Sequence, residues 1–439
     1  MKTISFILML FLSSHFFAKV RYVVNAESGL IIRKKPTSKS EKTGKFNYKD
    51  TIVVEKEIRK RADTIKDDGF TIPGYWIQVK TKENIKGYVF DGFIKKRIEG
   101  NNKRAKLKLY GPVKSITKYN TIYHYKKSKD SLYEGKTDYE EKIILDKNGN
   151  LLERYSYHWD NKIYLDYTRK YDANNHLLEH TNMLKGEIST KETYVYNKKG
   201  LLTEQNKFYG DKPYYKWMYT YDDKGNTIEE EDYYYDKMRS KRWKMSFDEN
   251  NNKILSEFYN YNEQHKLNFH YFYDSKKKIL KRTEENLFTK KTIPIEEFKY
   301  QELSNNNRQV THLKYNSEGK LKDKFIRRYD SIENMTEYLE YKEGSIDLHY
   351  GLKRTIKGNH KMVKRYDKNG LTDKDKYVYD YKGNLLMHQD FYTSEERKND
   401  IYSTTFYTYI FDKHSNWIVK KEFRGKLLKK VYYRDLKYY

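Results

Sequence analysis

The stretch LDKNGNLL, which runs from Leu145 to Leu152, holds a turn signal between two apolar ends. Asp146 can cap its own backbone, and Gly149 can adopt the left-handed conformation that most residues resist. The apolar pair Leu151-Leu152 then opens a new run of strand-forming residues. This stretch therefore predicts a tight turn with a β-strand on either side.

The same block returns along most of the chain, with an aromatic or apolar residue before Asp or Asn and usually Gly or Asn three residues later. The first six blocks are spaced by 25 or 26 residues, which indicates an internal repeat. Later blocks are less regular, and between about 282 and 365 we expect insertions or degenerate repeats. The blocks begin at Asp146, Asp172, Asn197, Asp222, Asp248, Asp274, Asn316, Asp330, Asp367, Asp380 and Asp412.

Alternating aromatic residues lead into the turns, as in Tyr194-Val195-Tyr196 and Tyr219-Thr220-Tyr221. On a strand this alternation places a ring on one face at every second residue. A second turn signal, such as the one at 210–213, separates successive blocks, so each repeat holds two strands of about ten residues. The sequence predicts an all-β protein in which residues 104–439 form an extended antiparallel β-hairpin repeat array.

With Tyr-Asp before the turn and Gly-Asn within it, roughly residues 140–415 resemble the tyrosine-aspartate (YD) repeats of the RHS family. The resemblance implies an extended β-sheet that can wrap a toxin cargo. The period is longer than is usual for that family, and neither its core-closing segment nor a toxin-like tail is found. We therefore expect a repeat scaffold rather than a complete cargo-bearing toxin.

Residues 19–103 consist of short β-branched and aromatic runs separated by turn residues, a pattern that is typical of a small β-barrel. They are similar to the bacterial SH3-like (SH3b) family. Membership of that family implies recognition of cell-wall or peptide ligands rather than catalysis. The matching blocks are Val24 to Leu30 with Arg33 and Pro36, Gly44, Gly74 to Val79, and Gly87 to Ile94.

The SH3-like resemblance makes Tyr75, Trp76, Tyr88 and Phe90 the candidate ligand-binding residues. Flat aromatic faces stack on sugars and peptides at little entropic cost. The alternative for Trp76 is a place in the core, because alternating aromatic residues fill the interior of so small a barrel.

Residues 1–18 have the basic, apolar and small-residue zones of a secretory signal peptide. Their apolar run is about half of the ~20 residues that a membrane-spanning helix needs, and no later segment comes near that length. The sequence thus predicts a periplasmic or secreted bacterial protein with no transmembrane span. The 89 Lys and Arg against 62 Asp and Glu give a net charge of +27, which favours anionic partners. Because the chain is exported, we expect those partners to be surface polymers and not nucleic acid.

The chain has no cysteine, which excludes disulfides, Cys-ligated zinc and cysteine nucleophiles. His176-Leu177-Leu178-Glu179-His180 matches the H-x-x-E-H zinc pattern, but the repeat period places these residues at the start of a strand. On a strand the two His residues lie about 13 Å apart, too far to share a metal ion. We expect no metal site, no cofactor and no catalytic residue.

Together these observations favour an exported, non-catalytic envelope protein. Its SH3-like module is expected to bind peptidoglycan, a wall peptide or an anionic surface polymer, with the repeats as a scaffold and another envelope protein as a further candidate partner. One alternative is an adhesin or toxin-related surface protein that binds through its sheet. Another is a cell-wall hydrolase with an unrecognised pair of carboxylates.

Overall fold

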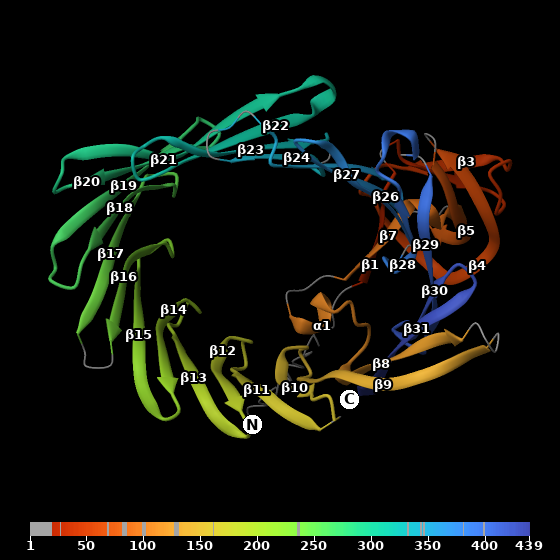
Figure 1. Cartoon of the computed structure of the whole chain (residues 1–439), viewed down its shortest axis with the longest axis horizontal. Coiled ribbons are helices and arrows are strands. Elements are labelled where there is room, and N and C mark those ends of the chain that lie inside the picture. The colour runs from red at the N-terminus through yellow and green to blue at the C-terminus, as the bar shows by residue number, and fades with distance from the viewer. Residues whose placement is uncertain are drawn as a thin grey trace, which may run out of the picture.

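Consecutive antiparallel hairpins form one closed barrel of 24 strands, seen as a ring in Figure 1. The computed structural model describes residues 20–26, 28–67, 70–80, 86–98, 102–126, 131–160, 162–234, 238–331, 333–342, 345, 347–380, 382–397 and 400–439. The strands of the barrel are β8 (Val113–Lys126), β9 (Ser131–Leu145), β10 (Leu151–Tyr157), β11 (Ile163–Tyr171), β12 (Leu177–Leu184), β13 (Glu187–Tyr196), β14 (Leu202–Tyr209), β15 (Lys212–Tyr221), β16 (Thr227–Tyr234), β17 (Arg239–Phe247), β18 (Lys253–Tyr259), β19 (His265–Tyr273), β20 (Ile279–Asn286), β21 (Lys291–Glu302), β22 (Arg308–Tyr315), β23 (Leu321–Tyr329), β24 (Met335–Lys342), β25 (Tyr350–Lys357), β26 (His360–Asp367), β27 (Gly370–Tyr379), β28 (Leu385–Phe391), β29 (Ile401–Phe411), β30 (Trp417–Arg424) and β31 (Leu427–Tyr438).

The all-β class and the antiparallel hairpins are confirmed, but the prediction of an extended array is wrong because the array closes on itself. Strand β31 pairs with β8, from Lys430 opposite Ile122 to Tyr438 opposite Val113. At this seam the rings of Tyr433 and Tyr119 stack with centroids 4.8 Å apart. Each strand of a sheet is rotated relative to the next, so a long run of hairpins curls until its two ends can pair.

The repeated turns lie at one end of the barrel, here called the first rim. In the turn that begins at Asp222, the two carboxylate oxygens accept hydrogen bonds from the backbone N–H and the side-chain Nδ2 of Asn226, both at 2.8 Å. Gly225 has a φ of +89°, as the turn signal predicted. The first-rim turns that carry the repeated block begin at Asp146, Asp172, Asn197, Asp222, Asp248, Asp274, Asp330, Asp380 and Asp412.

The irregular spacing between 282 and 365 arises because two first-rim turns lack the Asp or Asn block. The turn after β21 holds the 3-10 helix η3 (Ser304–Asn306), and β25 is joined to β26 by Gly358-Asn359 alone. The blocks at Asn316 and Asp367 begin turns at the opposite end, here called the second rim. The sheet is nevertheless continuous, since every strand from β20 to β27 pairs with the next.

The N-terminal segment forms a separate sheet in the order β3-β2-β6-β5-β4-β1-β7. The small barrel predicted for residues 19–103 is therefore corrected to a sheet whose edges are β3 and β7, with no pairing between them in its described residues. In these residues β7 pairs with β1 alone and β3 with β2 alone, so the sheet stays open at both edges. The strands are β1 (Val20–Val24), β2 (Leu30–Arg33), β3 (Lys42–Phe46), β4 (Thr51–Asp67), β5 (Phe70–Lys80), β6 (Lys86–Phe90) and β7 (Ile94–Ile98), with the 3-10 helix η1 (Asp91–Phe93) before β7.

A short helix, α1 (Lys103–Lys106), follows the N-terminal sheet and lies within the ring in Figure 1. Arg104 is buried and donates hydrogen bonds to the carbonyls of Asp146 at 2.9 Å and Val113 at 3.1 Å. These bonds tie the start of β8 to the turn that follows β9. In the part of the chain that the structure describes, no helix is long and apolar enough to cross a membrane.

The segment that follows α1 lies against the tyrosine-rich face of the sheet at β29. Leu107 and Tyr110, which follow α1, line a cavity together with Tyr409 and Phe411 of β29.

Candidate binding cleft at the junction of sheet and barrel

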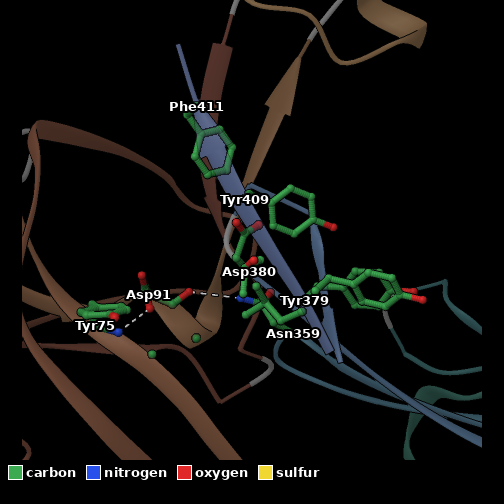
Figure 2. Close-up of a pocket in the computed structure, with 12 residues that line it drawn as sticks. Tyr75, Asp91, Asn359, Tyr379, Asp380, Tyr409 and Phe411 are labelled. Atoms are coloured by element: carbon green, nitrogen blue, oxygen red, sulfur yellow. Dashed lines mark hydrogen bonds between the residues drawn. The ribbon is translucent and has the colours of Figure 1, made fainter. Parts of the chain in front are cut away.

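A cavity of about 360 Å³ lies where the N-terminal sheet meets the first rim of the barrel, and Figure 2 shows it in close-up. We call it the junction cavity. Its volume falls within the range of about 300–1,000 Å³ that is usual for small-ligand sites. The sheet contributes Tyr75 and Asp91, and the barrel contributes Tyr379, Asp380, Tyr409 and Phe411.

The turn between β25 and β26 holds the sheet on the barrel. Nδ2 of Asn25 donates a hydrogen bond to the carbonyl of Gly358 at 2.6 Å. The backbone N–H of Asn359 donates to Gly92 at 3.1 Å, and its Nδ2 donates to the carbonyl of Asp91 at 3.2 Å. Asn359 is only 5% exposed, so this turn joins the two units through a buried contact.

Two glycines allow the close approach of the two units. Gly358 has a φ of +53°, and a Cβ placed there would lie 2.8 Å from the carbonyl oxygen of Gly92. On the sheet side, a Cβ at Gly74 would lie 2.6 Å from Oδ1 of Asp91. That space is instead used by the Asp91 carboxylate, which accepts the backbone N–H of Tyr75 at 2.6 Å.

The four ligand-binding residues predicted from the sequence do not form one platform. Tyr75 is 36% exposed and lines the junction cavity. Trp76 and Phe90 are 2% and 1% exposed, and their rings pack in the core with centroids 5.7 Å apart. Tyr88 is half-buried and packs against the same core. Of the four, Tyr75 alone reaches the cavity, because successive side chains of β5 point to opposite faces of the sheet.

On the barrel side of the cavity, Tyr409 and Asp380 are fixed in position by hydrogen bonds within the barrel. The hydroxyl of Tyr409 donates to the carbonyl of Leu385 at 2.8 Å. Burial raises the pKa of Tyr409 and of Tyr379, which keeps both hydroxyls protonated. The carboxylate of Asp380 accepts the N–H and Nδ2 of Asn384 at 2.8 and 2.9 Å.

The junction cavity combines aromatic rings with two carboxylates, Asp91 and Asp380, and no Lys, Arg or His is present in its described lining. Aromatic faces pack against sugar rings and apolar side chains, while carboxylates accept hydrogen bonds from ammonium and hydroxyl groups. The arrangement can therefore bind a ligand that carries amino or hydroxyl groups. Sequence reasoning missed the contributions of Asp91 and of the barrel residues. One feature of the sequence could have indicated this site. At Gly358-Asn359 the repeated Asp or Asn turn is missing, and this is the turn that contacts the sheet.

The H-x-x-E-H stretch is placed as the repeat period predicted, on a strand and the turn before it. His180 lies on β12, and its Nδ1 accepts a hydrogen bond from Nε of Arg169 at 3.1 Å. His176 lies in the preceding turn, where its Nδ1 is 2.9 Å from Oδ2 of Asp172. The two imidazoles thus have separate partners.

A different polar group, Asp375, His388 and Asp390, lies on β27 and β28, with one ligand atom of each within 4.8 Å of the others. Nε2 of His388 lies 2.7 Å from Asp375 and 3.1 Å from Asp390. Arg365 lies 2.6 Å from the other oxygen of Asp375, and the ring of Tyr377 stacks on His388. The imidazole and the guanidinium therefore already contact the carboxylates that a metal ion would need. The register of β26 to β28 creates this group, so sequence spacing did not indicate it.

Comparisons with known proteins give only distant structural likenesses. No family model and no curated protein matches the chain. A Photorhabdus luminescens Tc holotoxin pore structure is 11% identical with a TM-score of 0.33, and the match covers 83% of this chain but 23% of that one, so this chain spans about a quarter of its length. A porin-like protein from Bacteroides uniformis is 8% identical with a TM-score of 0.17, over 75% of this chain and 99% of that chain. A transferrin-binding protein B double mutant from Haemophilus parasuis is 8% identical with a TM-score of 0.13, over 95% of each chain.

Proposed function

We propose that the chain is an exported, non-catalytic binding protein of the bacterial envelope, and that the junction cavity holds a peptide or glycan of the cell wall. In this proposal the N-terminal sheet is a recognition module and the barrel is more than a scaffold, because it supplies half of the site. The single observation that carries the proposal is that the exposed Tyr75 of the sheet lines one cavity together with Tyr379, Tyr409 and Phe411 of the barrel.

The chemistry of the lining favours one of the three expected ligand classes. An anionic polymer would be repelled by the carboxylates of Asp91 and Asp380. A wall peptide or amino sugar offers ammonium, amide and hydroxyl groups that these carboxylates can accept, and sugar or aliphatic surfaces for Tyr75 and Tyr409. The junction cavity is therefore proposed to bind a wall peptide or amino sugar.

Co-sedimentation of the full chain with isolated peptidoglycan tests the proposal. At about 1 M salt, where the Debye length is about 3 Å, charge attraction is largely screened. We expect the unaltered chain to pellet under these conditions and Tyr75→Ala to pellet several-fold less. Tyr261→Ala is the matched control, since Tyr261 is 63% exposed but lies on the second rim. Loss of pelleting by the unaltered chain at high salt, or equal pelleting by Tyr75→Ala, would contradict the proposal.

A further inference from the structure

A second cavity, of about 250 Å³, lies beside the junction cavity and shares Tyr409 and Phe411 with it. We call it the basic cavity, because its charged lining is formed by Lys108, Lys382, Lys420 and Arg434. No Asp or Glu is among its described lining residues. Two neighbouring cavities on one rim therefore carry opposite charge.

Arg434 is held in this cavity without an acidic partner. Its guanidinium lies over the ring of Trp417, 3.5 Å from the centroid. Its Nε is buried and has no hydrogen-bond partner within the described structure. A buried donor that is left unsatisfied is costly, so a guanidinium in this state is suited to accept an anion.

Lys420 is positioned in a similar way. Its Nζ lies 4.3 Å from the ring centroid of Tyr407 and 4.7 Å from that of Tyr432. Burial lowers the pKa of Lys420, although Glu422 opposes this effect. Neither Lys420 nor Arg434 forms an ion pair in the part of the chain that is described.

The carboxylates that act electrostatically on Lys420 and Arg434 are engaged elsewhere. Glu422 accepts the hydroxyl of Tyr432 at 2.8 Å. Glu141, which acts on Arg434 from a distance, accepts Nε of Arg154 at 3.1 Å and is paired with Lys118. Arg434 and Lys420 therefore keep N–H donors for a ligand, while the rings of Trp417, Tyr409 and Phe411 offer flat surfaces beside them.

We propose that the basic cavity binds a sugar phosphate, with the phosphate on Arg434 and Lys420 and the sugar ring against Trp417. Arginine presents a planar fork that matches phosphate oxygens, and lysine adds a point charge. The cavity is smaller than a usual small-ligand site of about 300–1,000 Å³, so it suits one sugar unit rather than a polymer strand. This inference does not rest on the wall ligand of the junction cavity.

Calorimetric titration of the full chain with glucose 6-phosphate, inorganic phosphate and glucose tests this assignment. We expect glucose 6-phosphate to bind with a Kd of about 1 mM or lower, inorganic phosphate to bind more weakly, and glucose to show no binding. Arg434→Met and Lys420→Met should each weaken glucose 6-phosphate binding about tenfold or more. Lys191→Met is the control, since Lys191 also lies over a ring, that of Phe208 at 5.0 Å, but far from the cavity in the sheet order.

Two results would overturn the assignment. One is the absence of glucose 6-phosphate binding by the unaltered chain at millimolar concentration. The other is unchanged binding in a folded Lys420→Met or Arg434→Met variant, with folding checked by circular dichroism. Tyr75→Ala is expected to keep glucose 6-phosphate binding, so failure of the junction cavity and failure of the basic cavity give different results.

Discussion

The hydroxyl of Tyr273 donates a 2.9 Å hydrogen bond to the backbone carbonyl of Lys253, twenty residues earlier in the chain. Tyr273 is the residue just before a first-rim turn, and Lys253 opens the strand after the preceding turn. Where a tyrosine precedes the Asp or Asn of the block, its hydroxyl can therefore bond one repeat to the one before it. Equivalent bonds join Tyr196 to the carbonyl of Leu177 and Tyr221 to the carbonyl of Leu202.

Tyr273→Phe is predicted to lower the free energy of unfolding by about 1–2 kcal/mol, because it leaves the Lys253 carbonyl without its donor. Urea unfolding measures this loss. Tyr219→Phe is the control, since Tyr219 occupies the position two residues earlier in a repeat and its hydroxyl makes no hydrogen bond within the described structure. A loss for Tyr219→Phe as large as that for Tyr273→Phe would show that the inter-repeat bond has no special role.

Alkaline pH is predicted to unfold the barrel through its tyrosines. A hydrogen bond to Glu153 raises the pKa of Tyr155 to about 12, and burial raises the pKa of Tyr219 and Tyr407 to about 12. Since each folded pKa lies above the unfolded value of about 10, this stability is complete below pH ~10 and is lost as the pH rises toward ~12.

Phenolate absorbance followed during a pH titration measures this effect. We expect part of the tyrosine signal to titrate only near pH 12, together with the loss of β-sheet circular dichroism. Titration of all tyrosines near pH 10 in the folded protein would contradict the buried, bonded tyrosine face.

Gly358→Val is predicted to release the N-terminal sheet from the barrel while the barrel stays folded. The new side chain would meet Gly92 and Phe93, whose nearest atoms lie 2.8 and 2.9 Å from the Cβ position. Gly425→Val carries a similar backbone cost, because Gly425 has a φ of +59°, but no atom lies within 4 Å of its Cβ position. Limited proteolysis should separate the N-terminal sheet from the barrel faster in Gly358→Val than in Gly425→Val, and equal rates would speak against the proposed joint.

The local features of the fold were predictable from the sequence, and the long-range ones were not. The turn block at Asp222 and the alternation of Tyr219 and Tyr221 specify hairpins because they act over a few residues. Closure of the barrel depends on the rotation between neighbouring strands, summed over the whole sheet. The residues around Tyr119 and Tyr433 therefore give no sign in the sequence that these two rings stack.

The candidate site was only partly predictable for the same reason. Tyr75 was found as an exposed aromatic residue, but Trp76 and Phe90 were grouped with it although they lie opposite each other in register and share a buried face. The barrel residues of the junction cavity come from repeats that resemble all the others. Tyr379 and Tyr409 differ from the corresponding tyrosines of other repeats because the N-terminal sheet is bound next to them, at Gly358-Asn359.

Hydrogen–deuterium exchange of the full chain, with and without soluble wall muropeptides, tests the central claim that sheet and barrel build one site. The account predicts slower exchange on ligand addition in two separate segments, 74–75 with 91–92 from the sheet and 407–411 from the barrel. Turns of the second rim, such as 260–264, should be unchanged. Protection confined to the sheet, or no protection in either segment, would contradict a shared cleft.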